Sequence, residues 1–295
     1  FLHKHLRGFR RALWSFIMGK LIVAVGFLAI LVALVSGKVI KNDHANPKKE
    51  VQAAGSGKKF VCYYGTWSCY RPEGGKHCVQ NVDPFLCTHV VYGFTGLKNN
   101  VITPLDPYLD LEENWGKANF KKFNELKLIN PRLKTIIAIG GWNEGSERYS
   151  EMASSSGTRK TFIDSVVSFI GEHNFDGLDM DWEYPTDRGG VPADRENFAL
   201  LLKELSEAFQ PNGYLLTAAV SAGKDKFDNA YDIEAMNQYM DHIHLMTYDM
   251  HGAWDTFAHH NAPLREHKND KDHENATWFN IEYSVKMWVN GGVER

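Results

Sequence analysis

Strand-like and helix-like segments alternate through most of this 295-residue chain, and this alternation restricts the fold more than any other feature. The strand-like runs are nearly continuous in apolar residues, as expected for strands that are buried on both faces. They cover residues 61–67, 89–94, 135–139, 177–183, 215–221 and 242–248. The helix-like runs cover residues 117–128, 159–173, 194–208, 231–237 and about 278–290. Such alternation predicts an α/β protein with a parallel sheet.

The fourth strand-like run carries a cluster of carboxylic acids within the sequence FDGLDMDWEYP at residues 175–185. Side chains alternate between the two faces of a strand, so Asp179, Asp181 and Glu183 are predicted to share one face. Crowded like charges raise the pKa of at least one carboxyl group, which lets it remain protonated and act as a general acid. The alternatives are an acidic loop or a metal cage, but interleaved Leu, Met and Trp residues argue against a solvated loop. Asp176 falls outside the alternation and is interpreted as structural.

This run resembles the D-x-x-D-x-D-x-E signature of the family 18 glycoside hydrolases, the chitinases, and its flanks are similar to those of arthropod and animal members. The resemblance implies a (β/α)8, or TIM, barrel with this run as its fourth strand. It also implies that Glu183 protonates the leaving sugar oxygen, that Asp181 holds and polarises the substrate N-acetyl group, and that Asp179 shares a proton with Asp181. In this family the acetamido oxygen of the substrate is the nucleophile, so no cofactor or metal is implied.

Two further motifs fit the resemblance. The sequence IGGW at 139–142 resembles the family block S-x-G-G-W, with Ala138 where Ser is common, and MTYD at 246–249 resembles M-x-Y-D. The family implies that the hydroxyl of Tyr248 assists the acetamido group, and that several other side chains contact substrate. These are Tyr63, Phe94, Trp142, Met246, Asp249 and Trp254. Core packing is the alternative for Tyr63 and Phe94, and a barrel-lining position is the alternative for Met246.

The resemblance covers about residues 60–295, interpreted as part of a catalytic domain. This stretch holds six strand–helix units, whereas a closed barrel has eight. The first and sixth parallel strands would then expose unpaired edges. We therefore expect a barrel truncated after about six units, and we expect this chain alone to be poorly stable and inactive.

The N-terminal part has the pattern of a secretory leader. Residues 21–35 are apolar, follow Met18-Gly19-Lys20, and precede the small residues Ser36 and Gly37. Read from Met18, residues 1–37 are interpreted as a signal peptide with an upstream extension, because 15 apolar residues are fewer than the roughly 20 that span a bilayer. Upstream basic residues leave a membrane signal anchor as the alternative. Residues 38–59 are predicted to be a polar linker.

The cysteines agree with a secreted protein. Four cysteines allow three pairings, and a secretory context favours disulfides. The chitinase resemblance implies Cys62–Cys87, which leaves Cys69–Cys78. A glycosylation sequon begins at Asn275.

Composition narrows the remaining functions. A net charge of −3 gives no support for nucleic-acid binding, and the thirteen histidines lack a metal-ligand spacing. No glycine-rich phosphate loop is present in the sequence. We expect a monomeric, extracellular chitinase that binds chitin or N-acetylglucosamine oligosaccharides. The alternatives are a non-catalytic chitin-binding lectin on the same barrel and a related enzyme that releases N-glycans.

Overall fold

The computed structural model describes residues 57–272 and 276–294, which belong to one compact unit. The predicted signal peptide, most of the predicted linker and the sequon residue Asn275 lie outside the described residues. Among the helices of the described part, none has the length and apolar character needed to cross a membrane.

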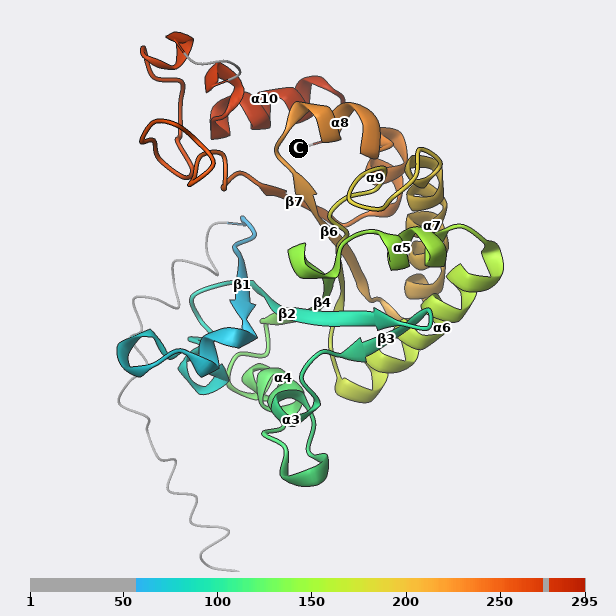
Figure 1. The fold of residues 1–295 in the computed structure, drawn as a ribbon. Helices are drawn as coiled ribbons and strands as arrows, with labels where there is room; N and C mark the ends of the chain where they lie inside the picture. Colours follow the sequence, from blue (N-terminus) through green and yellow to red (C-terminus); the bar gives the residue numbers. More distant parts are fainter. Residues whose placement is uncertain (1–56, 273–275, 295) are drawn as a thin grey trace, which may run out of the picture. The chain divides into compact units, whose positions relative to one another are not determined.

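A curled sheet of parallel strands organises the described part (Figure 1). Its order is β1-β2-β4-β5-β6-β7, so each parallel strand lies beside the next parallel strand in the chain. The strands are β1 (Val61–Gly65), β2 (His89–Lys98), β4 (Lys134–Gly140), β5 (Gly177–Asp181), β6 (Leu215–Ser221) and β7 (His242–Met246). The short strand β3 (Val101–Pro104) pairs antiparallel with the end of β2. The arrangement is an incomplete TIM barrel, as the sequence predicts.

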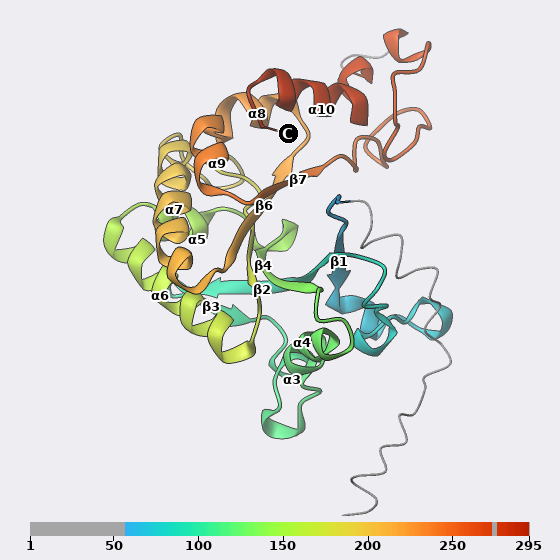
Figure 2. The ribbon, with the colours of Figure 1, turned by 180° about the vertical axis from the view of Figure 1, so that it is seen from behind.

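Helices follow the strands and cover the outer, convex side of the sheet (Figure 2). Five connecting helices agree with the predicted runs to within a few residues. They are α4 (Asn119–Ile129), α6 (Ser156–His173), α7 (Asp194–Phe209), α9 (Ile233–Tyr239) and α10 (Ile281–Asn290). Three further helices were not predicted: α3 (Pro107–Asp110), α5 (Glu147–Ala153) and α8 (Lys224–Ala230).

The core between sheet and helices explains the alternation in the acidic run. Leu178, Met180 and Trp182 are buried in the main hydrophobic cluster, together with side chains from α4, α6 and α7. The acidic residues between them therefore project from the opposite face of β5. The apolar half of the run anchors the strand and thereby fixes the direction of the carboxyl groups.

The contacts of Asp176 agree with the structural role that the sequence predicts for it. Its carboxylate accepts a hydrogen bond from the Thr135 amide at 2.9 Å and forms ion pairs of 3.1 Å with both Lys127 and Lys134. Burial of this carboxyl group opposes ionisation, but the Thr135 amide and Lys127 outweigh that effect and hold its pKa below the usual value. Asp176 thus links β5 to β4 and α4 before the strand begins.

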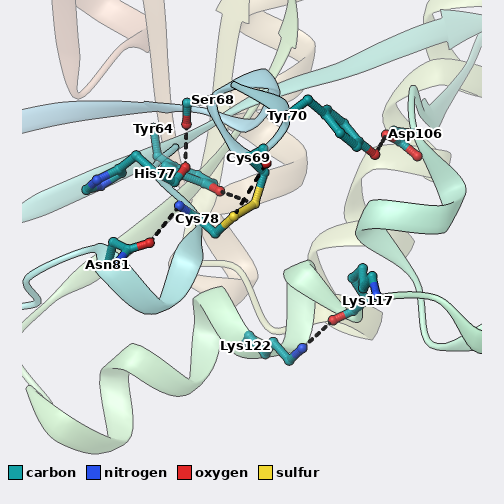
Figure 3. Close-up of a disulfide and its surroundings, with 10 residues drawn as sticks. All are labelled: Tyr64, Ser68, Cys69, Tyr70, His77, Cys78, Asn81, Asp106, Lys117 and Lys122. Atoms are coloured by element: carbon teal, nitrogen blue, oxygen red, sulfur yellow. Dashed lines mark hydrogen bonds between the residues drawn. A yellow bond between two sulfur atoms is a disulfide. The ribbon is translucent and has the colours of Figure 1, made fainter. Parts of the chain in front are cut away.

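Both expected disulfides are present. Cys62–Cys87 connects β1 to the segment just before β2, and Cys69–Cys78 closes the intervening loop. Around the second disulfide, the Ser68 hydroxyl donates to the His77 carbonyl at 2.5 Å (Figure 3). Covalent and hydrogen-bonded links therefore hold the loop that follows β1.

A core substitution gives the first testable prediction. Phe123 is fully buried and contacts the rings of Tyr64, Tyr92 and Phe175. Phe123→Ala should lower the free energy of unfolding by about 3–5 kcal/mol, because it removes buried apolar surface and leaves a cavity. Leu128→Ala, also on α4 but 81% exposed, should change it by less than about 0.5 kcal/mol. Urea denaturation would measure both values, and equal losses would contradict this account of the core.

Candidate active site

Three carboxyl groups lie at the carboxyl end of β5. Asp179 and Asp181 are on the strand, and Glu183 lies two residues beyond its end. The three side chains are buried, with exposed fractions of 0, 4 and 8% respectively. The alternation of directions along β5 brings them to the inner face of the curled sheet, in the place where TIM-barrel enzymes carry their catalytic groups.

Asp179 is contacted by polar side chains from three other strands. The Tyr63 hydroxyl donates to Asp179 Oδ2 at 2.7 Å from β1, and the Thr217 hydroxyl donates to Oδ1 at 2.6 Å from β6. His244 on β7 places its Nδ1 atom 3.1 Å from Oδ1 and 2.7 Å from the Tyr63 hydroxyl. Burial, and secondarily the charge of Asp179, raise the pKa of Tyr63 far above its usual value, so Tyr63 remains a donor.

Asp181 lies between the other two acids. Burial, followed by the nearby charges of Glu183 and Asp179, raises its pKa well above the usual value. This carboxyl group therefore keeps its proton to higher pH than an ordinary aspartate does. Within the described part of the chain, its Oδ1 atom is buried and has no hydrogen-bond partner. A buried polar atom of this kind is available to a ligand.

Glu183 is the acid closest to the open end of the strand. Burial raises its pKa, while a hydrogen bond involving Tyr184 and the positive charge of Arg188 act in the opposite direction. Its backbone carbonyl accepts a hydrogen bond of 3.1 Å from Arg188 Nη1. A carboxyl group with a raised pKa stays protonated to higher pH, which is the property a general acid requires.

The segment after β7 adds polar groups to this face. Tyr248 is 52% exposed, and burial of part of the ring, followed by the charge of Asp181, raises its pKa to about 12. Asp249 has a positive φ of 53° and accepts a hydrogen bond of 2.8 Å from Asn261 Nδ2. Met246 is partly buried at the end of β7, whereas Trp254 is largely exposed.

Aromatic rings lie within β2 and just after β1 and β4. The rings of Trp67 and Phe94 stack with centroids 6.1 Å apart and planes 9° apart. Gly141 has a φ of +85°, and a Cβ atom there would lie 3.1 Å from the Phe94 ring, so glycine suits this close approach. Trp142 is 59% exposed. The exposed rings of Trp67 and Trp142 provide surfaces on which sugar rings can stack.

Sequence reasoning missed Thr217, His244, Trp67 and Arg188. The first two carried a weak signal, since each lies on a predicted strand with a polar side chain among apolar neighbours. The residues described in the structure contain no group of three His, Cys, Asp or Glu side chains arranged to hold a metal ion.

Comparisons with known proteins agree with this geometry. The family model "Glycosyl hydrolases family 18" matches residues 59–295. "Probable chitinase 2" of Drosophila melanogaster is 49% identical over 232 residues, covering 78% of this chain and 47% of the relative. A crystal structure of Ostrinia furnacalis Group IV chitinase in complex with allosamidin is 47% identical, with a TM-score of 0.75, covering 80% of this chain and 63% of that one.

A third similar structure is human YKL-39, described as a pseudo-chitinase with retained chitooligosaccharide binding properties. It is 37% identical with a TM-score of 0.71, and the match covers 80% of this chain and 64% of that one. This chain thus spans less than two thirds of each of these relatives. The family match extends over both the sheet and the three carboxyl groups, and the chain belongs to glycosyl hydrolases family 18.

Proposed function

We propose that the protein is a chitinase that hydrolyses β-1,4 bonds between N-acetylglucosamine units with retention of configuration. One observation carries the proposal: three buried carboxyl groups share one face, and the central one has a raised pKa and an unpartnered oxygen. Such a set can hold one proton for transfer and still present a polar atom to the N–H group of an acetamido substituent.

In the proposed first step, Glu183 donates its proton to the glycosidic oxygen as the bond between that oxygen and C1 breaks. The acetamido oxygen of the same sugar forms a bond to C1 from the opposite face and produces an oxazolinium ion. Asp181 accepts a hydrogen bond from the acetamido N–H and stabilises the positive charge. Tyr248 donates a hydrogen bond to the acetamido oxygen and so holds it near C1.

In the second step, the Glu183 carboxylate accepts a proton from water while the water oxygen attacks C1. The bond to the acetamido oxygen breaks, and Glu183 regains the proton it lost. Two inversions at C1 give net retention. Asp179, fixed by Tyr63, Thr217 and His244, takes up the proton of Asp181 when Asp181 must be ionised.

The stereochemistry of the product tests this mechanism. The full-length protein should release the β-anomer first from chitotetraose, followed by slow mutarotation to the equilibrium mixture. Proton NMR of the anomeric signals in the first minutes would measure the ratio. Initial release of the α-anomer would contradict the substrate-assisted route, and absence of any hydrolysis would contradict the enzymatic function.

A non-catalytic lectin is the second candidate, because the similar human YKL-39 is described as a pseudo-chitinase that retains oligosaccharide binding. In this chain the acidic motif is complete, and Glu183 is buried with a raised pKa. A lectin has no need for such a proton donor, so the observation favours the enzyme.

We also propose that the protein acts outside the cell as a monomer, with chitin or its oligosaccharides as its partner. Two disulfides within the first 31 residues of the described part support an oxidising compartment. The signal peptide at residues 1–37 remains a proposal from the sequence, with a membrane anchor as its alternative.

A further inference from the structure

Arg188 contacts two parts of the candidate site that come from different loops. Its guanidinium carbon lies 3.6 Å from the centroid of the Trp142 ring. Its Nη1 atom donates a hydrogen bond of 3.1 Å to the backbone carbonyl of Glu183. One cation therefore connects an exposed aromatic ring after β4 to the candidate proton donor after β5.

The backbone around Arg188 is held in an unusual conformation. Arg188 has a φ of 52°, in the left-handed region that residues with a side chain seldom adopt. Two hydrogen bonds hold it: the Ser146 amide donates to the Arg188 carbonyl at 3.2 Å, and the Arg188 amide donates to Asp187 Oδ1 at 2.7 Å. The Ser146 hydroxyl also donates to the Tyr184 carbonyl at 2.8 Å. Such over-determined strained positions are concentrated at functional sites.

The loop that carries Arg188 is therefore fixed to the loop that carries Trp142. Ser146 lies four residues beyond Trp142 and makes both inter-loop hydrogen bonds. On the outer side, Asp187 forms an ion pair of 3.0 Å with Lys226 on α8. These contacts place the guanidinium group over the indole independently of any bound substrate.

The stacked guanidinium leaves much of the indole free. Trp142 remains 59% exposed with Arg188 in contact, so the ring still offers a surface to another group. A tryptophan side chain without such a contact can rotate about two bonds, and it must lose that freedom when a sugar stacks on it. A cation above one face removes that freedom in advance through the attraction between the charge and the ring quadrupole.

We propose that Arg188 is a positioning residue that holds Trp142 as a preformed platform for a sugar ring and ties that platform to Glu183. The proposal rests on the proposed function, because it assigns the sugar as the ligand of Trp142. It adds a residue that sequence reasoning did not select. Arg188 acts through Trp142 and through the backbone of Glu183, and it takes no part in bond making.

The same charge affects the proton donor. Arg188 stabilises the ionised form of Glu183 and so lowers its pKa, against the larger effect of burial. Removing the charge should raise the pKa of Glu183, and because the acid must be protonated to work, activity should persist to higher pH. Other titratable groups also act on Glu183 in this site: Asp181, Tyr184, Tyr248 and Asp249.

Oligosaccharide binding tests the proposal. In full-length protein carrying Glu183→Gln, which keeps the ligand intact, Arg188→Met should weaken chitopentaose binding about fivefold, the size expected for loss of one cation–π contact. Arg188→Lys should restore most of the affinity, because it restores a cation. Isothermal titration calorimetry would give the dissociation constants. Arg195→Met, a matched change at an exposed position on α7, should have no effect.

A double-mutant cycle separates positioning from general stability. With Trp142→Ala already present, Arg188→Met should cause less than about a twofold further loss, because the residue through which it acts is gone. With Glu183 restored, Arg188→Met should move the alkaline limb of kcat/KM to higher pH, and Trp142→Ala should not. Unchanged or tighter chitopentaose binding by Arg188→Met would overturn the proposal. The proposal would also be wrong if Arg188→Met weakened binding as much in the Trp142→Ala protein as in the protein that keeps Trp142. Absence of hydrolysis by the unmodified protein would overturn the enzymatic function alone.

Discussion

Glu183→Gln should lower kcat on a fluorogenic chitobioside about 10³-fold in the full-length protein, with little change in KM. Glutamine preserves the shape of the side chain but has no acidic proton, and a positioned general acid contributes roughly 10²–10⁴-fold to such a reaction. The effect should be this large because Glu183 serves twice, as the acid in bond cleavage and as the base for water. Steady-state fluorescence release would measure both constants.

The control for this variant is Glu207→Gln, which makes the same chemical change on the exposed side of α7. It should leave kcat within about twofold, since surface substitutions away from special features have small effects. Allosamidin, the ligand in the similar Ostrinia structure, should still bind the Glu183→Gln protein if the site remains folded. A Glu183→Gln protein that binds allosamidin and keeps more than a tenth of its activity would contradict the assigned role.

The parallel strands of the fold were accessible from sequence because most of their runs are nearly continuous in apolar residues. The run at 215–221 matches β6 at both ends. The run at 177–183 extends two residues beyond β5, since the alternation of Trp182 and Glu183 continues after the strand pairing stops at Asp181. β3 escaped prediction because four residues carry too little periodic signal to distinguish a strand from a loop.

The site residues that lie on one segment could be predicted from the sequence. The contacts between residues from distant segments were harder to predict. Asp179, Asp181 and Glu183 share a strand, so their common direction follows from the period of two. Thr217 lies on β6, which pairs directly with β5, so its contact with Asp179 follows from the strand order. Tyr63 on β1 and His244 on β7 are not on neighbouring strands of β5, and the curvature of the sheet brings them to Asp179. Similarly, the contact of Arg188 with Trp142 joins two loops. Loops have no periodic hydrophobic pattern, so their conformations could not be predicted from the sequence.

Asp181→Asn separates two roles that a carboxyl group with a raised pKa can have. Asparagine imitates the neutral, protonated form of Asp181, so it would be tolerated if the reaction needed only a neutral hydrogen-bonding group. If ionised Asp181 stabilises the positive oxazolinium ion, the variant should lose about 10²–10³-fold in kcat, the usual effect of removing one preorganised electrostatic partner. We expect this larger loss, because the proposed oxazolinium ion is positively charged and a neutral asparagine cannot balance that charge.

The pH dependence of this variant gives the second measurement. In the proposed mechanism Asp181 acts in its ionised form, and its pKa is raised, so activity should fall as the pH decreases and a growing fraction of Asp181 is protonated. An asparagine side chain cannot ionise, so this acid limb should disappear from kcat in Asp181→Asn while the alkaline limb set by Glu183 remains. Asp164→Asn, an exposed residue on α6, should retain both limbs and full activity. An Asp181→Asn protein with near-normal kcat would show that the neutral form of Asp181 suffices, and the charge-stabilising role would then be wrong.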